Sequence, residues 1–206
     1  MTDMTILIPI NQGIYYRYIF QTDIFKKLQK EAKKIIILAP DKNDQFYSDI
    51  IFYDNVIIED YKEIEYEEYM NSSKLHLNLK RIRNFVQNSK FDISTTLGHH
   101  KIYKNDFNSY SHTIISRLNF WISNFIIFFA RRIKVIRKFI LFIENKLFSP
   151  DIHQDIFDKY KPDLLLVTSL GTFDYDQFFM RQAKKNDVKV VSVILSWDNT
   201  TTRGYP

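Results

Sequence analysis

Cysteine is absent from the 206-residue sequence, and glycine occurs only four times. Without cysteine the chain has no disulfides and no thiolate metal ligands. Neither G-x-G-x-x-G nor G-x-x-x-x-G-K-S/T occurs, so the usual glycine-rich loops that bind dinucleotides and nucleoside triphosphates are excluded. The sequence therefore predicts neither a cofactor nor a metal.

Two kinds of targeting segment are also missing from the sequence. Its first residues lack the basic stretch and following apolar stretch of a secretory signal. No uncharged apolar run reaches the roughly 18–20 residues of a conventional membrane span. We therefore expect a cytoplasmic protein.

The composition is that of an ordinary globular protein with a basic surface. Hydrophobic residues make up 45% of the chain, charged residues 26%, and the net charge is +5. A basic balance permits nucleic acid, an anionic membrane surface or phosphorylated molecules as partners. Nucleic acid is not expected, because the cations gather on an apolar helix rather than beside an exposed aromatic platform.

Short apolar runs alternate with helical patterns, which is typical of an α/β fold with a Rossmann-like parallel sheet flanked by helices. Strands are expected at residues 5–10, 35–39, 55–58, 164–168 and 189–195, with a further weak strand at 91–97. Helices are expected at residues 17–32, from about 64 to 88, 151–160 and 174–185. The whole chain, residues 1–206, is expected to form a single domain with a helical insertion at about 111–148.

The segment from Arg117 to Phe148 carries an apolar residue at every third or fourth position, the spacing of one continuous helical stripe. The stripe consists of Leu118, Ile122, Phe125, Phe129, Ile133, Ile136, Ile140, Ile143 and Leu147. One interpretation is a long helix or a helical pair packed on the sheet or on a partner. The other is an interfacial helix whose aromatics enter an anionic membrane surface while its cations contact the headgroups.

Ligands in open α/β sheets bind beyond the carboxyl ends of the strands, and three expected strands end in polar segments. The first segment contains Asn11, Gly13 and Arg17. Gly13 is expected to supply a left-handed turn or a close backbone approach, and Arg17 to contact an anion. An ordinary turn is the alternative.

The second segment, residues 168–177, holds Ser169 in a loop where it could face a ligand. Asp174 and Gln177 have the spacing of a capping box, and helix capping alone would explain the acidic residues there.

The third segment follows an apolar run at residues 190–195 that is expected to be a buried strand. Trp197 offers a flat face for stacking a sugar ring or a base, and Asp198 and Asn199 suit hydroxyl groups. Thr201 and Arg203 suit a phosphate or a helix cap, and Gly204 allows a turn. A simple Asx-type loop is the alternative.

The histidines give weaker signals. His99 and His100 are adjacent and point apart, so we expect a surface loop rather than a chelating pair. His76, His112 and His153 stand among polar residues and are expected to be exposed.

Two stretches resemble the N-terminal domain of GT-B-fold glycosyltransferases from bacterial surface-polysaccharide clusters. "ILIPINQGIYYRYIFQTDIFKKL" is similar to their opening strand, loop and Arg-Asn-hydrophobic-Leu-Arg-Thr helix start. Arg17 and Thr22 match this start, whereas Tyr18 and Gln21 replace the asparagine and the second arginine. The final 46 residues resemble their last strand, helix and strand, followed by a Ser-Trp-Asp-Asn-x-Thr-x-x-Gly signature. The signature residues are Ser196, Trp197, Asp198, Asn199, Thr201 and Gly204.

The resemblance implies the acceptor-side half of a two-domain transferase, with a nucleotide-sugar donor bound mainly by a second domain beyond Pro206. It implies sugar transfer without metal to a polysaccharide or lipid-linked acceptor, with Asp198 as the first candidate for general base and Asp174 as the second. Trp197 and Asn199 would position the acceptor, and Arg17 or Arg203 would stabilise phosphate. A lipid-linked acceptor would explain a membrane-facing helix, on the inner face of the cytoplasmic membrane.

Two other functions remain open from the sequence. One is a nucleotide-sugar 2-epimerase-like or glycerophosphate-transferring enzyme of the same fold. The other is a non-enzymatic, membrane-peripheral binding protein.

Overall fold

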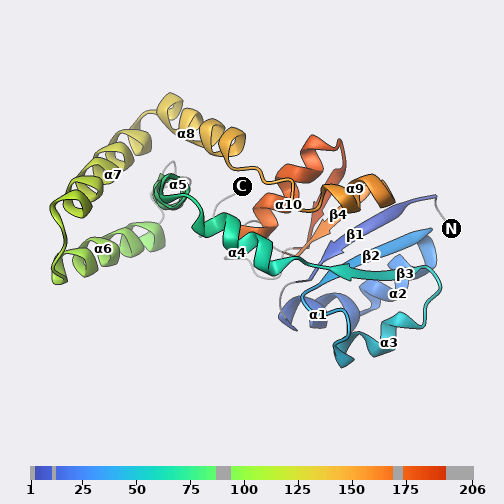
Figure 1. Cartoon of the computed structure of the whole chain (residues 1–206). Coiled ribbons are helices and arrows are strands. Elements are labelled where there is room, and N and C mark those ends of the chain that lie inside the picture. Colours follow the sequence, from blue (N-terminus) through green and yellow to red (C-terminus); the bar gives the residue numbers. More distant parts are fainter. Residues whose placement is uncertain (1–2, 11–12, 87–93, 169–173, 194–206) are drawn as a thin grey trace. The chain divides into compact units, whose positions relative to one another are not determined.

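The computed structural model describes residues 3–10, 13–86, 94–168 and 174–193. The chain forms two compact units, which we name by their content. The α/β unit comprises the described residues of Met1–Glu68 and Pro150–Leu195, and the helical unit those of Tyr69–Ser149 (Figure 1). The helical unit begins well before the insertion expected at about 111–148.

The α/β unit contains a five-stranded sheet whose strands are all parallel. The strands are β1 (Thr5–Pro9), β2 (Lys34–Ala39), β3 (Val56–Asp60), β4 (Leu164–Val167) and β5 (Lys189–Ser192). Their order in the sheet is β3-β2-β1-β4-β5, with Ile6 opposite both Ile35 and Leu164. This arrangement confirms the predicted Rossmann-like α/β fold.

Both faces of the central strands are buried, which explains why their sequences are continuous apolar runs rather than alternating ones. Ile8 and Ile37 pack on one face against Ile19 and Phe25. The helical elements on that face are α1 (Gly13–Phe20), α2 (Asp23–Glu31), the 3₁₀ turn η1 (Gln45–Tyr47) and α3 (Ser48–Ile51). The opposite face is covered by α9 (Gln154–Tyr160) and α10 (Asp174–Lys185), as Figure 1 shows.

The single helix predicted over residues 17–32 is wrong, because the chain breaks after α1 and restarts as α2. Thr22 is the N-cap of α2, where its hydroxyl oxygen accepts a hydrogen bond from the Ile24 amide at 3.3 Å. The same hydroxyl donates to the Tyr18 carbonyl at 2.8 Å. Threonine thus satisfies backbone groups on both sides of the break, and the apolar periodicity does not reveal this.

The expectation of a buried strand at residues 190–195 is also wrong over its described part. Val190 and Val191 in β5 are 38% and 47% exposed. Among the described strands β5 pairs only with β4, so it is an edge strand, whereas apolar runs alone indicate a central one. Residues 194 and 195 lie outside the described residues.

The helical unit is built from α5 (Lys74–Val86), α6 (Ser94–Ser109), α7 (Ile114–Arg132) and α8 (Lys134–Leu147), preceded by the end of α4 (Glu63–Asn71). The strand predicted at 91–97 is wrong from Ser94 onward, where α6 begins, and residues 91–93 lie outside the described part. The helical pair, rather than one long helix, is present over 117–148. Ile133 adopts an extended backbone between α7 and α8.

A small apolar cluster and a buried ion pair hold α5, α7 and α8 together. The cluster consists of Ile82, Val86, Ile127, Ala130 and Ile140. Beside it the Arg83 guanidinium lies 3.2 Å from the Glu144 carboxylate, and both side chains are at most 3% exposed. Charges this deeply buried require each other, because either one alone would lose its hydration without compensation.

Candidate functional site

The sheet places the three predicted polar segments after three neighbouring strands. These segments follow β1, β4 and β5, and the sheet order puts β4 between the other two. The β1–β4 boundary is also the point at which the strand order reverses, since β1 leads to β2 on one side and pairs with β4 on the other. In parallel α/β sheets such a reversal opens a crevice at the carboxyl ends of the strands, where ligands bind.

Most of the predicted site residues lie outside the described part of the chain, so their roles stay predictions. They are Asn11, Ser169, Ser196, Trp197, Asp198, Asn199, Thr201, Arg203 and Gly204. Gly13 and Arg17 are described.

Gly13 and Arg17 both lie in α1. Gly13 opens the helix without a left-handed backbone, and a methyl group built on its Cα would meet no atom within 4 Å. The expectation that Gly13 supplies a left-handed turn is therefore wrong, no described protein atom approaches it closely, and its contact with a ligand stays a prediction. Arg17 is exposed in the last turn of α1, where its guanidinium is accessible to an anion.

A tight turn at the carboxyl end of β3 positions the next helix. The Asp60 carboxylate accepts a hydrogen bond from the Lys62 amide at 2.8 Å, and Lys62 has a left-handed backbone with φ of 55°. The Lys62 ammonium group then pairs with Asp155 at 2.7 Å. This turn starts α4, which carries Tyr66 into the interior of the α/β unit.

Tyr66 and His153 form the centre of a buried polar cluster. The Tyr66 hydroxyl lies 3.2 Å from His153 Nδ1, and both side chains are fully buried. Burial, with Lys62 as a second cause, lowers the pKa of His153 to about 4, and burial raises the pKa of Tyr66 well above its usual value. Both groups are therefore neutral at pH 7 and serve the packing of this unit. Asp176, in the first turn of α10, is buried close enough to Tyr66 to contribute to raising the pKa of that hydroxyl.

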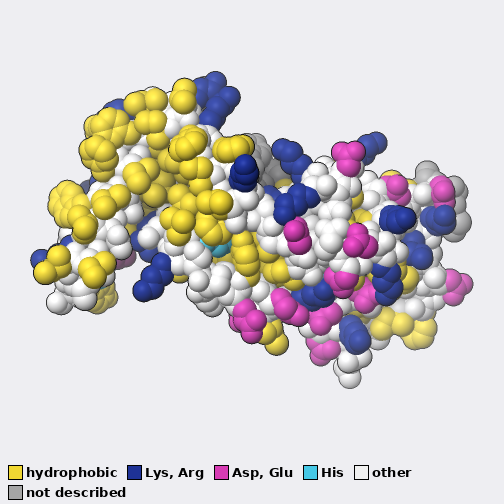
Figure 2. Space-filling view, turned by 45° about the horizontal axis from the view of Figure 1, so that its top comes forward, with side chains coloured by type: hydrophobic (Ala, Val, Ile, Leu, Met, Phe, Trp, Pro, Cys, Tyr) yellow, Lys and Arg dark blue, Asp and Glu magenta, His cyan; other side chains and the backbone are white. Residues whose placement is uncertain are grey.

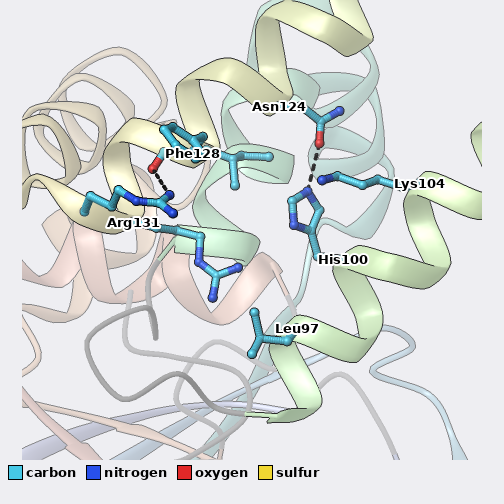
Figure 3. Close-up of a pocket in the computed structure, with 8 residues that line it drawn as sticks. Leu97, His100, Lys104, Asn124, Phe128 and Arg131 are labelled. Carbon is cyan, nitrogen blue, oxygen red and sulfur yellow. Dashed lines mark hydrogen bonds between the residues drawn. The ribbon is translucent and has the colours of Figure 1, made fainter.

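The helical unit contains a pocket of about 430 Å³ between α6 and α7 (Figure 3). Leu97, His100, Lys104, Asn124, Ile127, Phe128, Arg131 and Arg132 line it. Three of these side chains are cationic at pH 7, and no lining residue is acidic. The pocket is therefore an electropositive site of a size that holds a small ligand group.

His100 is held in one orientation at the edge of this pocket. His100 Nε2 lies 2.9 Å from Asn124 Oδ1, and Asn124 Nδ2 donates to the Phe120 carbonyl at 2.9 Å. Because the second bond fixes the amide orientation, Nε2 carries the proton and Nδ1 is a hydrogen-bond acceptor in the neutral ring. Burial lowers the pKa of His100, and the neighbouring Lys104 and Arg131 lower it further.

Beside the pocket, α7 and α8 expose a broad apolar face, visible as the large hydrophobic area over the helical unit in Figure 2. Its members are more than 40% exposed. They are Ile114, Ile115, Leu118, Trp121, Ile122, Phe125, Phe128, Ile133, Val135, Phe139, Phe142 and Leu147. We call this set the apolar face. The α/β unit in the same view mixes acidic and basic side chains across its surface.

The apolar stripe predicted over 117–148 does not form a core face in α7. Leu118, Ile122 and Phe125 point outward, whereas the buried residues of α7 are Phe120, Ser123, Ile127 and Ala130. Apolar side chains surround nearly the whole helix, so spacing alone does not select the inward side. Small residues such as Ser123 and Ala130 select it, because they let α7 approach its neighbours closely.

The histidines were the least well predicted residues. His76, His100 and His153 are buried, contrary to the expectation of exposure, and His99 lies in α6 rather than in a loop. His112 is half-buried and stacks on the Phe107 ring with centroids 3.8 Å apart. The pocket around His100 was missed altogether. The one signal for it was the polar pair Ser123-Asn124 inside an apolar helix.

Searches against protein-family models, curated proteins and solved structures find no match to this chain. Among the described residues, no helix is both long and apolar enough to cross a membrane. The same part of the chain contains no group of three or more histidine, cysteine or acidic residues placed to hold a metal ion.

Proposed function

We propose that the chain is the acceptor-binding half of a glycosyltransferase that moves a sugar from a nucleotide-sugar donor to a lipid-linked or surface-polysaccharide acceptor. One observation carries this proposal. The three segments that hold the candidate site residues follow the neighbouring strands β1, β4 and β5, on both sides of the reversal in strand order. This is where α/β enzymes bind their substrates.

In this proposal Asp198 is the general base that removes the proton from the acceptor hydroxyl. Trp197 and Asn199 hold the acceptor in the orientation for attack, which lowers the entropic part of the barrier. Arg17, exposed on α1, stabilises phosphate charge together with Arg203. The donor is bound mainly by a second domain.

The proposal also places the helical unit on an anionic membrane surface. The α7–α8 segment carries seven basic residues and one acidic residue, and that acid, Glu144, is buried against Arg83. The basic residues are Arg117, Arg131, Arg132, Lys134, Arg137, Lys138 and Lys146. Exposed aromatics beside basic residues are the features of helices that lie in the headgroup region of a bilayer. Each cation near an anionic surface contributes about 1 kcal/mol to binding.

Sugar transfer is tested with the protein as its gene encodes it. Nucleotide sugars are supplied with a bacterial lipid extract, and release of the nucleotide is followed by chromatography. Asp198→Asn is expected to lower turnover by about 10²–10⁴-fold, because a general base contributes roughly that factor. Asp187→Asn, an exposed carboxylate before β5, is the matched control and should keep full activity.

The outcomes separate the alternatives. A 2-epimer formed without acceptor would identify an epimerase, and transfer of glycerol phosphate would identify the third enzyme class. Full activity of Asp198→Asn would remove Asp198 from the mechanism. Absence of turnover with every donor would leave a non-enzymatic membrane-peripheral protein.

Membrane binding is tested by flotation with vesicles that contain phosphatidylglycerol. The double variant Phe139→Ser/Phe142→Ser removes two exposed rings from the apolar face. Burying a phenylalanine side chain is worth about 1.5–3 kcal/mol, so we expect binding to fall about 100-fold. Phe52→Ser is the control, because Phe52 is 83% exposed but lies in the α/β unit. Equal flotation of the double variant and Phe52→Ser would exclude the apolar face as the membrane contact.

A further inference from the structure

Lys104, Arg131 and Arg132 line the pocket between α6 and α7, and its described lining residues include no acidic side chain. Lys104 has no ion-pair partner in the described part of the chain, and it lies near enough to His100 to lower the pKa of that ring. Arg132 donates to the Phe128 carbonyl at 3.3 Å and stacks on the Phe128 ring. Both side chains are exposed, so their charge is available to a ligand in the pocket.

The polar wall of the pocket is rigid. His100 is only 8% exposed, and it is fixed by Asn124 on its edge and by the Phe85 ring, whose centroid is 4.6 Å away. Its Nδ1 atom is the acceptor of the neutral ring, because Nε2 donates to the Asn124 amide oxygen, and in Figure 3 the ring borders the same space as Arg131. An acidic hydroxyl group can donate to Nδ1 or protonate it. A group with both anionic oxygens and such a proton, as a phosphate monoester has, matches this wall.

The pocket adjoins the apolar face through Phe128, which lines the pocket and is 49% exposed. Trp121, Phe125, Phe128 and Arg132 are spaced by four, three and four residues, so they lie along one side of α7. A ligand whose charged end occupies the pocket can therefore lay an apolar tail along the aromatic side chains of the same helix.

We propose that this pocket binds the phosphate group of a phosphorylated amphiphile, with Lys104, Arg131 and Arg132 contacting the phosphate oxygens and the apolar face contacting the acyl or isoprenoid tail. The inference rests on the membrane-surface part of the proposed function and not on sugar transfer. Guanidinium groups bind phosphate oxygens in a bidentate geometry, which gives a pocket more selectivity than a diffuse basic surface has.

The test compares vesicles of equal surface charge but different headgroups. Phosphatidylcholine vesicles contain either phosphatidic acid, with a phosphate monoester, or phosphatidylserine, with the contents adjusted to equal zeta potential. The full protein is expected to bind the phosphatidic acid vesicles about 10-fold more tightly. The double variant Lys104→Gln/Arg132→Gln should lose that preference while still floating on both vesicles.

The control variant is Lys138→Gln/Lys146→Gln, which removes two exposed cations of α8 that do not line the pocket. It should weaken binding to both vesicles by similar factors and retain the 10-fold preference. Equal binding of the two vesicle types by the unmodified protein would overturn the proposal, as would a preference that survives Lys104→Gln/Arg132→Gln.

A second experiment, done without vesicles, tests whether the pocket binds free phosphate. It does not require that the protein bind membranes. Inorganic phosphate is titrated against the protein while the His100 ring signals are followed by NMR. Saturable shifts that Lys104→Gln/Arg132→Gln abolishes, together with the vesicle preference, support the phosphorylated amphiphile. The same shifts without any vesicle preference overturn the amphiphile and assign free phosphate. If the His100 signals do not shift and the protein shows no preference between the vesicles, the pocket is not a phosphate site. If the protein only fails to float on vesicles, the membrane-surface proposal alone is contradicted.

Discussion

The two units of this chain use their apolar and charged residues in opposite ways. In the α/β unit every residue of β1 is buried, and the ion pair between Lys185 and Asp151 lies on the surface. In the helical unit Trp121 and Val135 are at least 70% exposed, while Arg83 and Glu144 are buried. The fraction of hydrophobic residues is similar in both units, so hydrophobicity alone does not decide what becomes core.

The number of neighbouring elements around a helix or strand decides which of its residues become core. A central strand of the sheet is flanked by two strands and covered by helices on both faces, so each of its side chains finds an apolar contact. Within the described part of the chain, α7 packs on the side that carries Ser123, Ile127 and Ala130, and its other side exposes large apolar residues. This exposed apolar surface, bordered by basic residues, is the part of the helical unit that the proposed membrane contact uses.

The largest effect that distinguishes the units should come from their ion pairs. Glu144→Ala leaves the Arg83 guanidinium buried without its 3.2 Å partner, and we expect the free energy of unfolding to fall by about 3–5 kcal/mol. Asp151→Ala removes the partner of Lys185, with both side chains roughly half exposed, and should cost at most about 1 kcal/mol. Urea denaturation followed by circular dichroism measures both.

Two further variants test the reason for this difference. Arg83→Met/Glu144→Leu replaces the buried pair by apolar side chains and should recover most of the stability lost in Glu144→Ala. Equal losses in Glu144→Ala and Asp151→Ala would show that the buried pair is accessible to water, and the contrast between the two units would then disappear.

The second prediction concerns pH and belongs to the α/β unit. His153 stays neutral in the folded protein down to a pKa of about 4, whereas a histidine in the unfolded chain takes up its proton near pH 6.5. Between these values the unfolded state binds more protons, so stability falls as the pH falls, by about 3 kcal/mol in total. The stability difference between pH 7 and pH 4 should be smaller by about that amount in His153→Gln than in the unmodified protein.

Titration of the His153 ring by NMR checks the cause directly. A midpoint near 6.5 in the folded protein would contradict the prediction, because the ring would then be hydrated.

The fold of the α/β unit could be predicted from the sequence because local pattern and tertiary environment agree there. Continuous apolar runs such as that of β2 are typical of strands covered on both faces, and a parallel sheet with helices on both sides provides such strands. Residues 190 and 191 in β5 share the pattern but lie at an edge. Strand order is a property of the whole sheet, so no local pattern reveals an edge position.

The sequence could predict those candidate site residues that directly follow a strand, because an apolar run that ends in polar residues is a local pattern. The sequence identifies the three polar strand ends one by one, and the sheet order shows that the strands before them, β1, β4 and β5, are neighbours. The pocket at His100 was not predictable, because it requires Asn124, 24 positions away in sequence, to fix the ring. His153 was missed for the same reason, since its burial depends on Tyr66, 87 positions away.

The smallest predicted effect concerns the N-caps of two helices, one in each unit, both of which are threonines. Thr22 caps α2 in the α/β unit, and Thr113 caps α7 in the helical unit by accepting a hydrogen bond from the Ser116 amide at 3.2 Å. Replacing either threonine by alanine should cost about 1 kcal/mol, which is about a 5-fold increase in the population of the open state.

Amide hydrogen exchange shows where that cost appears. Because each unit has its own core, Thr22→Ala should speed exchange about 5-fold in β1 and β2 while leaving α7 and α8 unchanged, and Thr113→Ala should do the reverse. If either variant accelerates exchange equally in both units, the chain unfolds as one cooperative body. The exposed apolar face would then be part of a single folding unit and not the surface of a separately stable helical one.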